Sequence, residues 1–196
     1  PAPVADVMCR HPSGRLEAVK ISTFSASQSQ DVIKLFARAF SESEGQDEGE
    51  LIAQLVSDLI VSTDERDIVG FVAVLEEEIV ACIFFSRLIL TNGKIAFILS
   101  PVAVATEQQG NGIGQEIIRF GIGYLRSMGA DLVFTYGEPA FYSKVGFQQI
   151  SEDIVKAPLK LTQPEGWLAQ SLRNSVIDAA QGSSQCVKAL NKQEYW

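Results

Sequence analysis

Histidine is almost missing from this sequence, since His11 is the only one in 196 residues. Catalytic triads of serine or cysteine use histidine as the base, and many metal sites use histidine ligands. His11 stands between Arg10 and Pro12, in a segment without periodicity. A histidine-containing triad and a histidine-based metal cluster are therefore nearly excluded, and we expect no metal.

Cysteine and long apolar runs are also scarce. Cys9, Cys82 and Cys186 are odd in number, lie far apart and form no C-x-x-C pair. This usage disfavours a disulfide framework or a zinc site and is typical of idle thiols in a reducing compartment. No apolar run approaches the roughly 20 residues that span a bilayer, and residues 1–14 lack the apolar core of a signal peptide. We expect a cytoplasmic location and no membrane partner.

Basic residues form no stripe along the chain, whose formal net charge is -8. We therefore expect no nucleic-acid partner. The acidic balance favours cationic partners such as polyamines or basic peptides, although net charge mostly reports on solubility. The length fits one domain with a substantial core. We expect a loose lead-in over residues 1–17 and a single domain over residues 18–196.

The first third of the sequence predicts one strand and two helices. Residues 18–24 alternate like a strand, and apolar residues then recur at helical spacing in 32–40 and 51–60. Ser27 or Ser29 is a candidate N-cap for the first helix. Between the helices, half of residues 41–50 are acidic, which we interpret as a solvated loop. The alternative is a substrate-facing rim for a cationic amine.

The middle of the sequence changes to strand patterns over residues 68–75, 79–90 and 95–104. Asn92-Gly93 between two of these runs predicts a hairpin. Pro101 removes a donor from the last strand, so a bulge or a splayed edge is expected there.

A glycine-rich loop follows, leading into a helix that ends at Gly129. Next come a buried strand at 132–134, a short helix beginning with Glu138-Pro139 and closed by Gly146, and candidate strands at 167–169 and 186–187. A strand, a crossover helix and a strand in succession imply a parallel pair inside an otherwise antiparallel sheet.

The glycine loop indicates an anion site, because its backbone N–H groups lie at the positive end of the helix dipole. The P-loop pattern is absent, since no lysine follows the glycines. The dinucleotide pattern G-x-G-x-x-G also fails, and Q-x-x-G-x-G from Gln109 to Gly114 remains. Alone, such a loop is equally compatible with a plain tight turn.

Two motifs together resemble one family. Val102-Ala103-Val104 followed by Gln109-x-x-Gly112-x-Gly114 resembles motif A of the GNAT-type N-acetyltransferases, and Tyr142 to Phe147 resembles the Y-x-x-x-G-F element of that family. Leu99 to Val104 and Gly137 to Tyr142 further resemble a bacterial subgroup known only as predicted N-acetyltransferases. The resemblance covers residues 18–147 well and the remainder less specifically.

The resemblance implies an α/β (α+β) GNAT fold, with a mixed central β-sheet, a splayed parallel strand pair and flanking helices. It implies acetyl-CoA as cosubstrate and Tyr142 as the general acid for the departing thiolate. It also implies that backbone N–H groups of Val102 or Val104 polarise the thioester carbonyl. The residues that it assigns to cofactor binding are Val102, Ala103, Val104, Gln109, Gly110, Asn111, Gly112, Ile113, Gly114 and Gln115.

The expected activity is direct transfer of the acetyl group to a primary amine of a small molecule or peptide. The alternative is a non-catalytic acyl-CoA-binding or regulatory protein on the same fold. The sequence does not select the general base among Glu44, Glu48 and Glu138, nor does it fix the acyl chain length, the acceptor or the oligomeric state. A homodimer is left open.

Overall fold

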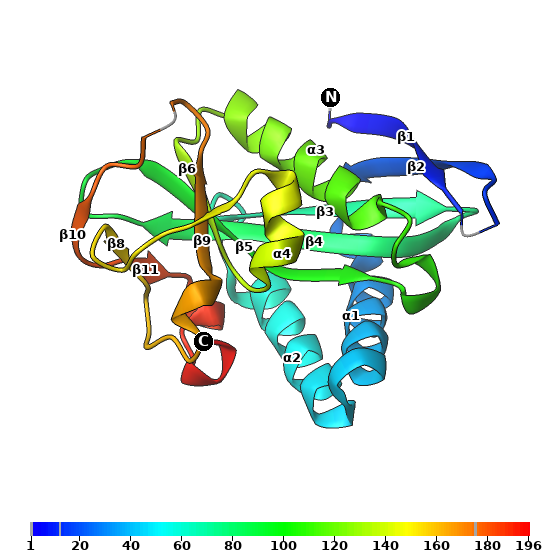
Figure 1. Ribbon diagram of the computed structural model, residues 1–196. Coiled ribbons are helices and arrows are strands. Elements are labelled where there is room, and N and C mark those ends of the chain that lie inside the picture. Colours follow the sequence, from blue (N-terminus) through cyan, green and yellow to red (C-terminus); the bar gives the residue numbers. More distant parts are fainter. Residues whose placement is uncertain (1, 12, 175) are drawn as a thin grey trace. The chain divides into compact units, whose positions relative to one another are not determined.

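A computed structural model describes residues 2–11, 13–174 and 176–196 (Figure 1). The chain divides into two compact units. The first contains the residues up to Phe84 together with Pro101–Gly121, and the second contains Phe85–Ser100 and Ile122–Trp196. Strands β4 (Glu78–Ile89) and β5 (Ile95–Val104) and helix α3 (Ile113–Ser127) contribute residues to both units.

The sheet of the first unit begins with three antiparallel strands and continues with the residues of β4 and β5 that belong to this unit. Val19 and Ile21 of the second strand are completely buried, as the alternation at 18–24 predicts. The prediction of a loose lead-in over residues 1–17 is wrong, because residues 4–10 and 16–17 of this segment pair in the sheet. The three strands are β1 (Val4–Arg10), β2 (Leu16–Thr23) and β3 (Ile68–Leu75).

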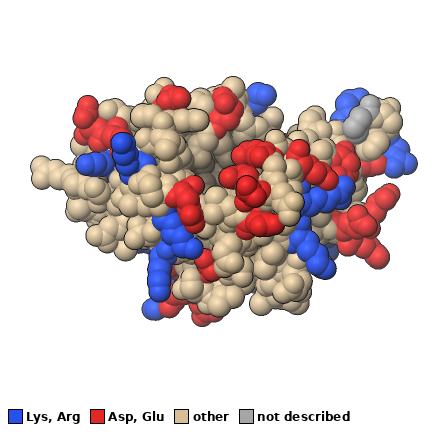
Figure 2. Space-filling view, turned by 90° about the horizontal axis from the view of Figure 1, so that it is seen from below, with Lys and Arg blue, Asp and Glu red and all other residues tan. Residues whose placement is uncertain are grey.

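Two long helices, α1 (Ser29–Glu44) and α2 (Gln46–Ser62), follow one another in the first unit. Gly45, with a φ of 104°, is the residue between them. The predicted solvated loop over residues 41–50 is therefore wrong, because all of these residues except Gly45 are helical. A run of acidic residues is as compatible with the exposed face of a helix as with a loop. Figure 2 shows acidic side chains gathered over the junction of α1 and α2.

Close packing between these helices depends on Gly49. A Cβ at Gly49 would lie 1.8 Å from Ser41 Oγ and 2.6 Å from the Ala37 carbonyl oxygen, so no larger residue fits. The core of the unit is aromatic: the Phe84 ring lies 5.3 Å from that of Phe24 and 6.2 Å from that of Phe36.

The second unit contains the predicted parallel pair. Ala96–Leu99 of β5 pair in parallel with Leu132–Thr135 of β6, and β6 pairs antiparallel with β9. The predicted strands at 167–169 and 186–187 correspond to β9 and β11. The elements are β6 (Leu132–Tyr136), α4 (Pro139–Tyr142), β7 (Gln148–Gln149), β8 (Val155–Lys156), β9 (Trp167–Ser171), β10 (Ala180–Ser183) and β11 (Gln185–Cys186).

Tryptophans organise the core of the second unit. The Trp167 ring stacks 5.1 Å from that of Phe134 and lies 6.1 Å from that of Trp196, and both indole N–H groups donate to backbone carbonyls at 2.9 Å. Short 3-10 turns complete the two units at Ala26–Gln28, Thr106–Gln108 (η2), Ser143–Val145 (η3), Pro164–Gly166, Lys188–Leu190 and Gln193–Tyr195.

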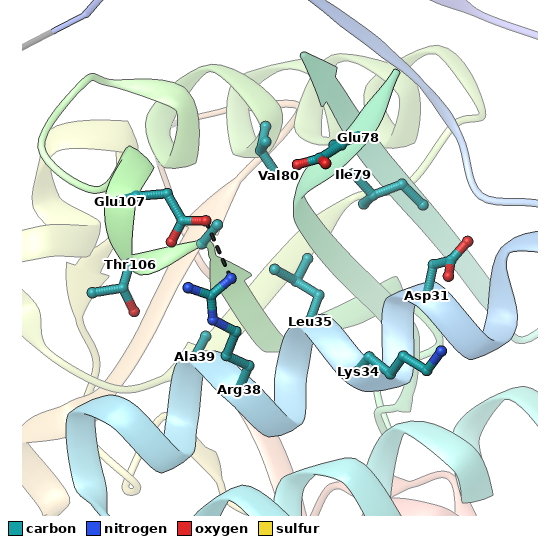
Figure 3. A pocket seen from close by; sticks show the side chains of 11 residues that line it. Asp31, Lys34, Leu35, Arg38, Ala39, Glu78, Ile79, Val80, Thr106 and Glu107 are labelled. Carbon is teal, nitrogen blue, oxygen red and sulfur yellow. Dashed lines mark hydrogen bonds and ion pairs between the residues drawn. The ribbon is translucent and has the colours of Figure 1, made fainter. Parts of the chain in front are cut away.

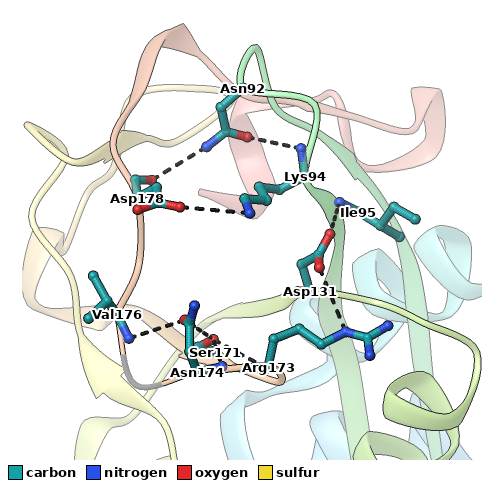
Figure 4. A network of polar contacts seen from close by, with 9 residues as sticks. All are labelled: Asn92, Lys94, Ile95, Asp131, Ser171, Arg173, Asn174, Val176 and Asp178. Atoms are coloured by element: carbon teal, nitrogen blue, oxygen red, sulfur yellow. Dashed lines mark hydrogen bonds and ion pairs between the residues drawn. The ribbon is translucent and has the colours of Figure 1, made fainter.

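A polar network links the β4–β5 hairpin of the second unit to Asp131 and Asp178 (Figure 4). The Asp131 carboxylate accepts from the Ile95 N–H at 2.8 Å, and the Lys94 ammonium lies 3.8 Å from the Asp178 carboxylate. Gly93, with a φ of 74°, completes the Asn-Gly turn that the sequence predicts. In the described part of the chain, no helix is long and apolar enough to cross a membrane.

Candidate functional site

The glycine loop lies in the first unit, between η2 and the start of α3. Gly110 and Gly112 have φ values of 82° and 84°, which glycine adopts without the steric cost that a Cβ imposes. A Cβ at either position would meet no atom within 4 Å, so backbone conformation rather than crowding favours glycine here. The loop turns sharply and leaves open space beside its backbone.

Six consecutive backbone N–H groups, those of residues 110–115, donate no hydrogen bond within the described part of the chain. After this row, the Glu116 N–H is the first to donate within the protein, to the Gly112 carbonyl at 3.0 Å. Such a row at a helix N-terminus binds anions through its N–H dipoles and the helix dipole. The loop therefore fits a pyrophosphate group.

Side chains of the loop brace it. The Gln109 side chain donates to the Val104 carbonyl at 3.1 Å, and the Asn111 amide donates to Gln108 Oε1 at 3.1 Å. The Gln109 N–H donates to the Thr106 carbonyl at 3.3 Å. The free amides thus begin at Gly110, and the exposed Gln109 side chain links the loop to the end of β5.

The end of β5 contains Val102, Ala103 and Val104, the three residues whose backbone is predicted to contact the cofactor. β5 continues through Pro101 to Val104, beyond the residues that pair with β6. Ala103 is buried, whereas Val102 and Val104 are half-buried. Directly after the strand, the Ala105 N–H donates to the Val80 carbonyl at 2.8 Å, which holds the exit of β5 against β4.

An unpredicted set of contacts joins α1 to η2. The Glu42 carboxylate accepts from Arg38 Nε at 2.9 Å and from the Thr106 hydroxyl, and Arg38 Nη1 lies 3.3 Å from Glu107 Oε1. The Thr106 hydroxyl and then the Arg38 guanidinium hold the pKa of Glu42 below its usual value. Only the i, i+4 spacing of Arg38 and Glu42 is visible in the sequence; the contacts with η2 depend on the fold.

Of these residues, Arg38, Thr106 and Glu107 line a cavity of about 180 Å³ (Figure 3). Leu35 and Ala39 of α1, together with Val80 of β4, supply its apolar lining, and Arg38 reaches across to Glu107. The cavity lies wholly within the first unit.

Tyr142 belongs to the second unit and ends the short helix α4. Glu138 caps this helix by accepting from the Ala140 N–H at 3.1 Å, and Gly146, with a φ of 95°, closes the following turn. The Tyr142 ring meets those of Phe141 and Phe147 edge to face, at centroid distances of 5.0 and 5.7 Å. Backbone and aromatic neighbours therefore hold the ring in one orientation.

The phenol of Tyr142 is enclosed although part of the residue is exposed. Burial raises the pKa of Tyr142 to about 12, and a hydrogen-bonding interaction with the Thr135 side chain partly offsets this. The Thr135 hydroxyl itself donates to the Leu99 carbonyl at 2.8 Å. Tyr142 is thus fully protonated near neutral pH and able to donate.

The three candidate bases have different surroundings. Burial and, secondarily, the neighbouring Glu44 raise the pKa of the Glu48 carboxyl. Glu138 is engaged as a helix cap. Glu44 ends α1 and is exposed. In the residues that the structure describes, no group of three His, Cys, Asp or Glu side chains is arranged to hold a metal ion.

Comparisons with known proteins agree with this geometry. The model of the acetyltransferase (GNAT) domain matches residues 20–150. The uncharacterized N-acetyltransferase YjhQ of Escherichia coli K12 is 32% identical over 152 residues, covering 74% of this chain and 80% of YjhQ.

Solved structures show the same fold. YhbS of Escherichia coli, solved in complex with CoA, has a TM-score of 0.77 at 20% identity, covering 93% of this chain and 97% of YhbS. A GNAT acetyltransferase from Brucella melitensis, solved with acetyl-CoA, has a TM-score of 0.64 at 22% identity, covering 88% of this chain and 97% of its own. With the family match over residues 20–150, these findings establish that the chain belongs to the GNAT family and is an acyltransferase.

Proposed function

We propose that this protein transfers the acetyl group of acetyl-CoA directly to a primary amine of a small molecule or peptide. The observation that carries the proposal is the row of free N–H groups at residues 110–115, at the start of α3. A pyrophosphate has several anionic oxygens to accept from such a row, and family membership makes coenzyme A the ligand that supplies it.

The cofactor-binding residues of the proposal are in the first unit. The backbone of Gly110, Asn111, Gly112, Ile113, Gly114 and Gln115 binds the pyrophosphate, and the Gln109 side chain keeps the loop attached to the end of β5. Val102, Ala103 and Val104 contact the pantetheine arm through their backbone, and an N–H of Val102 or Val104 polarises the thioester carbonyl.

Bound acetyl-CoA supplies the acetyl group as a thioester, whose C–S bond breaks as the C–N bond to the acceptor amine forms. Tyr142 donates the phenolic proton to the departing sulfur, and a base removes a proton from the amine. A thiol has an ordinary pKa near 8.5. Burial raises the pKa of Tyr142 to about 12, so the phenol keeps its proton until the more basic thiolate form of the leaving group develops in the transition state.

Glu48 is the best supported of the three candidate bases, because burial and the nearby Glu44 raise its pKa. A carboxyl with a raised pKa accepts a proton more readily. The acidic residues at the junction of α1 and α2 favour an acceptor with positive charge.

We treat the chain as one N-acetyltransferase domain that extends the predicted range 18–196 to include β1, because β1 pairs with β2 along its whole length. A boundary between the two compact units would cut β4, β5 and α3, each of which contributes residues to both. The three free thiols favour a cytoplasmic location.

Calorimetric titration tests the binding half of the proposal. We expect acetyl-CoA to bind with a dissociation constant of about 10 µM or tighter. S-acetyl-N-acetylcysteamine, a thioester without a pyrophosphate, should bind roughly a hundred-fold more weakly, because it cannot reach the amide row. Equal affinity for the two would contradict the assigned pyrophosphate site.

Thiol release in the presence of a panel of amines tests the catalytic half. An enzyme releases CoA faster with an acceptor than without one. Tight acetyl-CoA binding with no amine-dependent release across polyamines, amino sugars and peptide N-termini would contradict transfer to these classes of primary amine.

A further inference from the structure

Strand β1 (Val4–Arg10) forms the outer edge of the sheet in the first unit (Figure 1). In the described part of the chain, β2 is its one ladder partner, in a register that places Val7 opposite Val19. The His11 N–H donates to the Arg15 carbonyl at 2.8 Å, so His11 and Arg15 are a hydrogen-bonded pair of the ladder. Every second residue of β1, counted back from His11, is therefore also hydrogen-bonded to β2. The backbone groups of odd-numbered residues therefore face β2, and those of even-numbered residues face away from the sheet.

The even-numbered side chains of β1 lie on one exposed face. Val4 is 54% and Met8 59% exposed, and Asp6 and Arg10 alternate with them. Neither Asp6 nor Arg10 belongs to an ion pair in the described residues. An edge strand of seven residues with apolar exposed side chains and outward backbone groups is a template for another strand.

The charges of β1 select its partner. When two copies of β1 run antiparallel with Met8 opposite Met8, Asp6 of each copy lies opposite Arg10 of the other. All these positions have outward-facing N–H and C=O groups, so each opposed pair is able to form both ladder hydrogen bonds. A shift of two residues pairs each charge with an apolar side chain, and a shift of four opposes either two Asp6 or two Arg10 residues.

We propose that β1 pairs with β1 of a second copy of this chain, antiparallel and centred on Met8, with Asp6 of each copy opposite Arg10 of the other. The pairing is isologous, so it closes as a two-fold dimer. It brings the exposed Val4 and Met8 side chains of both copies onto one face of a continuous sheet. Because the opposed charges are exposed, the dimer weakens as salt rises.

A charge exchange tests the register. Sedimentation velocity at low ionic strength should show a concentration-dependent dimer of the wild type. Asp6→Arg or Arg10→Asp alone should weaken dimerisation roughly ten-fold or more, because two attractions become two repulsions. The double variant Asp6→Arg/Arg10→Asp should recover the wild-type association within about three-fold, since it restores opposite charges. Thermal unfolding of all three variants checks that each is folded.

Cross-linking tests the centre of the ladder without altering its charges. Met8→Cys places two thiols opposite each other at a Cα separation of about 5.5 Å, within the range for a disulfide. Val4→Cys is the matched control, because the two thiols then lie about 26 Å apart along the ladder. Mild oxidation should convert Met8→Cys to a disulfide-linked dimer. Val4→Cys and the wild type should form no such covalent dimer.

Three results would overturn the proposal. The first is a chain that forms no homodimer at about 1 mM. This includes the case in which a strand of another protein, and not a second copy, binds to the edge of β1. The second is a dimer that both single charge variants leave unchanged. The third is equal cross-linking of Met8→Cys and Val4→Cys.

Discussion

Gly137 packs directly against the ring of Tyr142. A Cβ at Gly137 would lie 2.7 Å from Tyr142 Cε2, closer than a real Cβ contact permits. Gly137 follows β6, and its own N–H donates to the Gly166 carbonyl at 3.0 Å. The glycine therefore allows the ring of the proposed proton donor to approach the backbone closely, and a side chain at position 137 must displace the ring.

We expect Gly137→Ala to lower turnover by roughly ten- to a hundred-fold, because a displaced phenol no longer meets the departing sulfur. The affinity for acetyl-CoA should change little, since the amide row is elsewhere in the chain. Gly123→Ala is the matched control: a Cβ there meets nothing within 4 Å, and alanine favours a helix. Steady-state kinetics with calorimetric binding measures both effects, and equal turnover of the two variants would contradict the packing argument.

Tyr142→Phe should lower turnover by roughly 10²–10⁴ if the hydroxyl is the proton donor. The ring and its aromatic contacts remain, so the unfolding temperature should stay close to that of the wild type. Pre-steady-state measurement of CoA release is the appropriate readout, because it isolates the chemical step. A loss smaller than threefold with chemistry rate-limiting would remove Tyr142 from the mechanism.

The pKa of Tyr142 predicts the shape of the pH profile. Burial raises this pKa from 10.0 to about 12, so the phenol stays protonated where an ordinary tyrosine would ionise. kcat/KM should therefore rise as the amine loses its proton and show no fall from Tyr142 below pH 10. Since the folded pKa exceeds the unfolded one, the linked stability is present below pH 10 and is lost as pH rises from 10 towards 12. Ultraviolet titration of wild type against Tyr142→Phe measures the pKa, and ionisation of Tyr142 near pH 10 would contradict this prediction.

The contact between Glu42 and Thr106 predicts a binding defect. Thr106→Val removes the hydroxyl that donates to Glu42 and loosens η2, which precedes the amide row. We expect acetyl-CoA to bind a few-fold more weakly, with kcat almost unchanged, since one exposed hydrogen bond is lost. Thr91→Val is the control, because that hydroxyl donates to the Gln181 carbonyl in the second unit. Equal affinities of the two variants would show that η2 needs no such support.

Local patterns predicted most of the elements. The β-branched runs predicted β3, β4 and β5, and Asn92-Gly93 and Gly146 mark turns whose positive φ values glycine accommodates. The strand at the lead-in is hard to recognise because apolar residues lie on both of its faces: Val4 and Met8 are exposed, while Ala5, Val7 and Cys9 are half-buried or buried, so no clear apolar–polar alternation marks it. The loop at 41–50 was misjudged because charge alone does not separate a loop from an exposed helix surface.

The candidate site was predictable only in part. The Q-x-x-G-x-G pattern located the loop, since the positive φ values at Gly110 and Gly112 favour glycine. The sequence did not reveal that the Gln109 side chain braces Val104, nor that α1 supports η2 through Glu42 and Thr106. These contacts join residues up to 64 positions apart, and only folding brings them together.

The central claim is that the amide row of residues 110–115 binds the pyrophosphate of acetyl-CoA. The most direct test is a titration of the ¹⁵N-labelled protein with acetyl-CoA, followed by backbone amide NMR. We predict that the resonances of Gly110, Gly112 and Gly114 shift downfield as their N–H groups donate to the anion, while that of the exposed Gly93 turn stays in place. Unchanged resonances for residues 110–115 at millimolar acetyl-CoA would contradict the account.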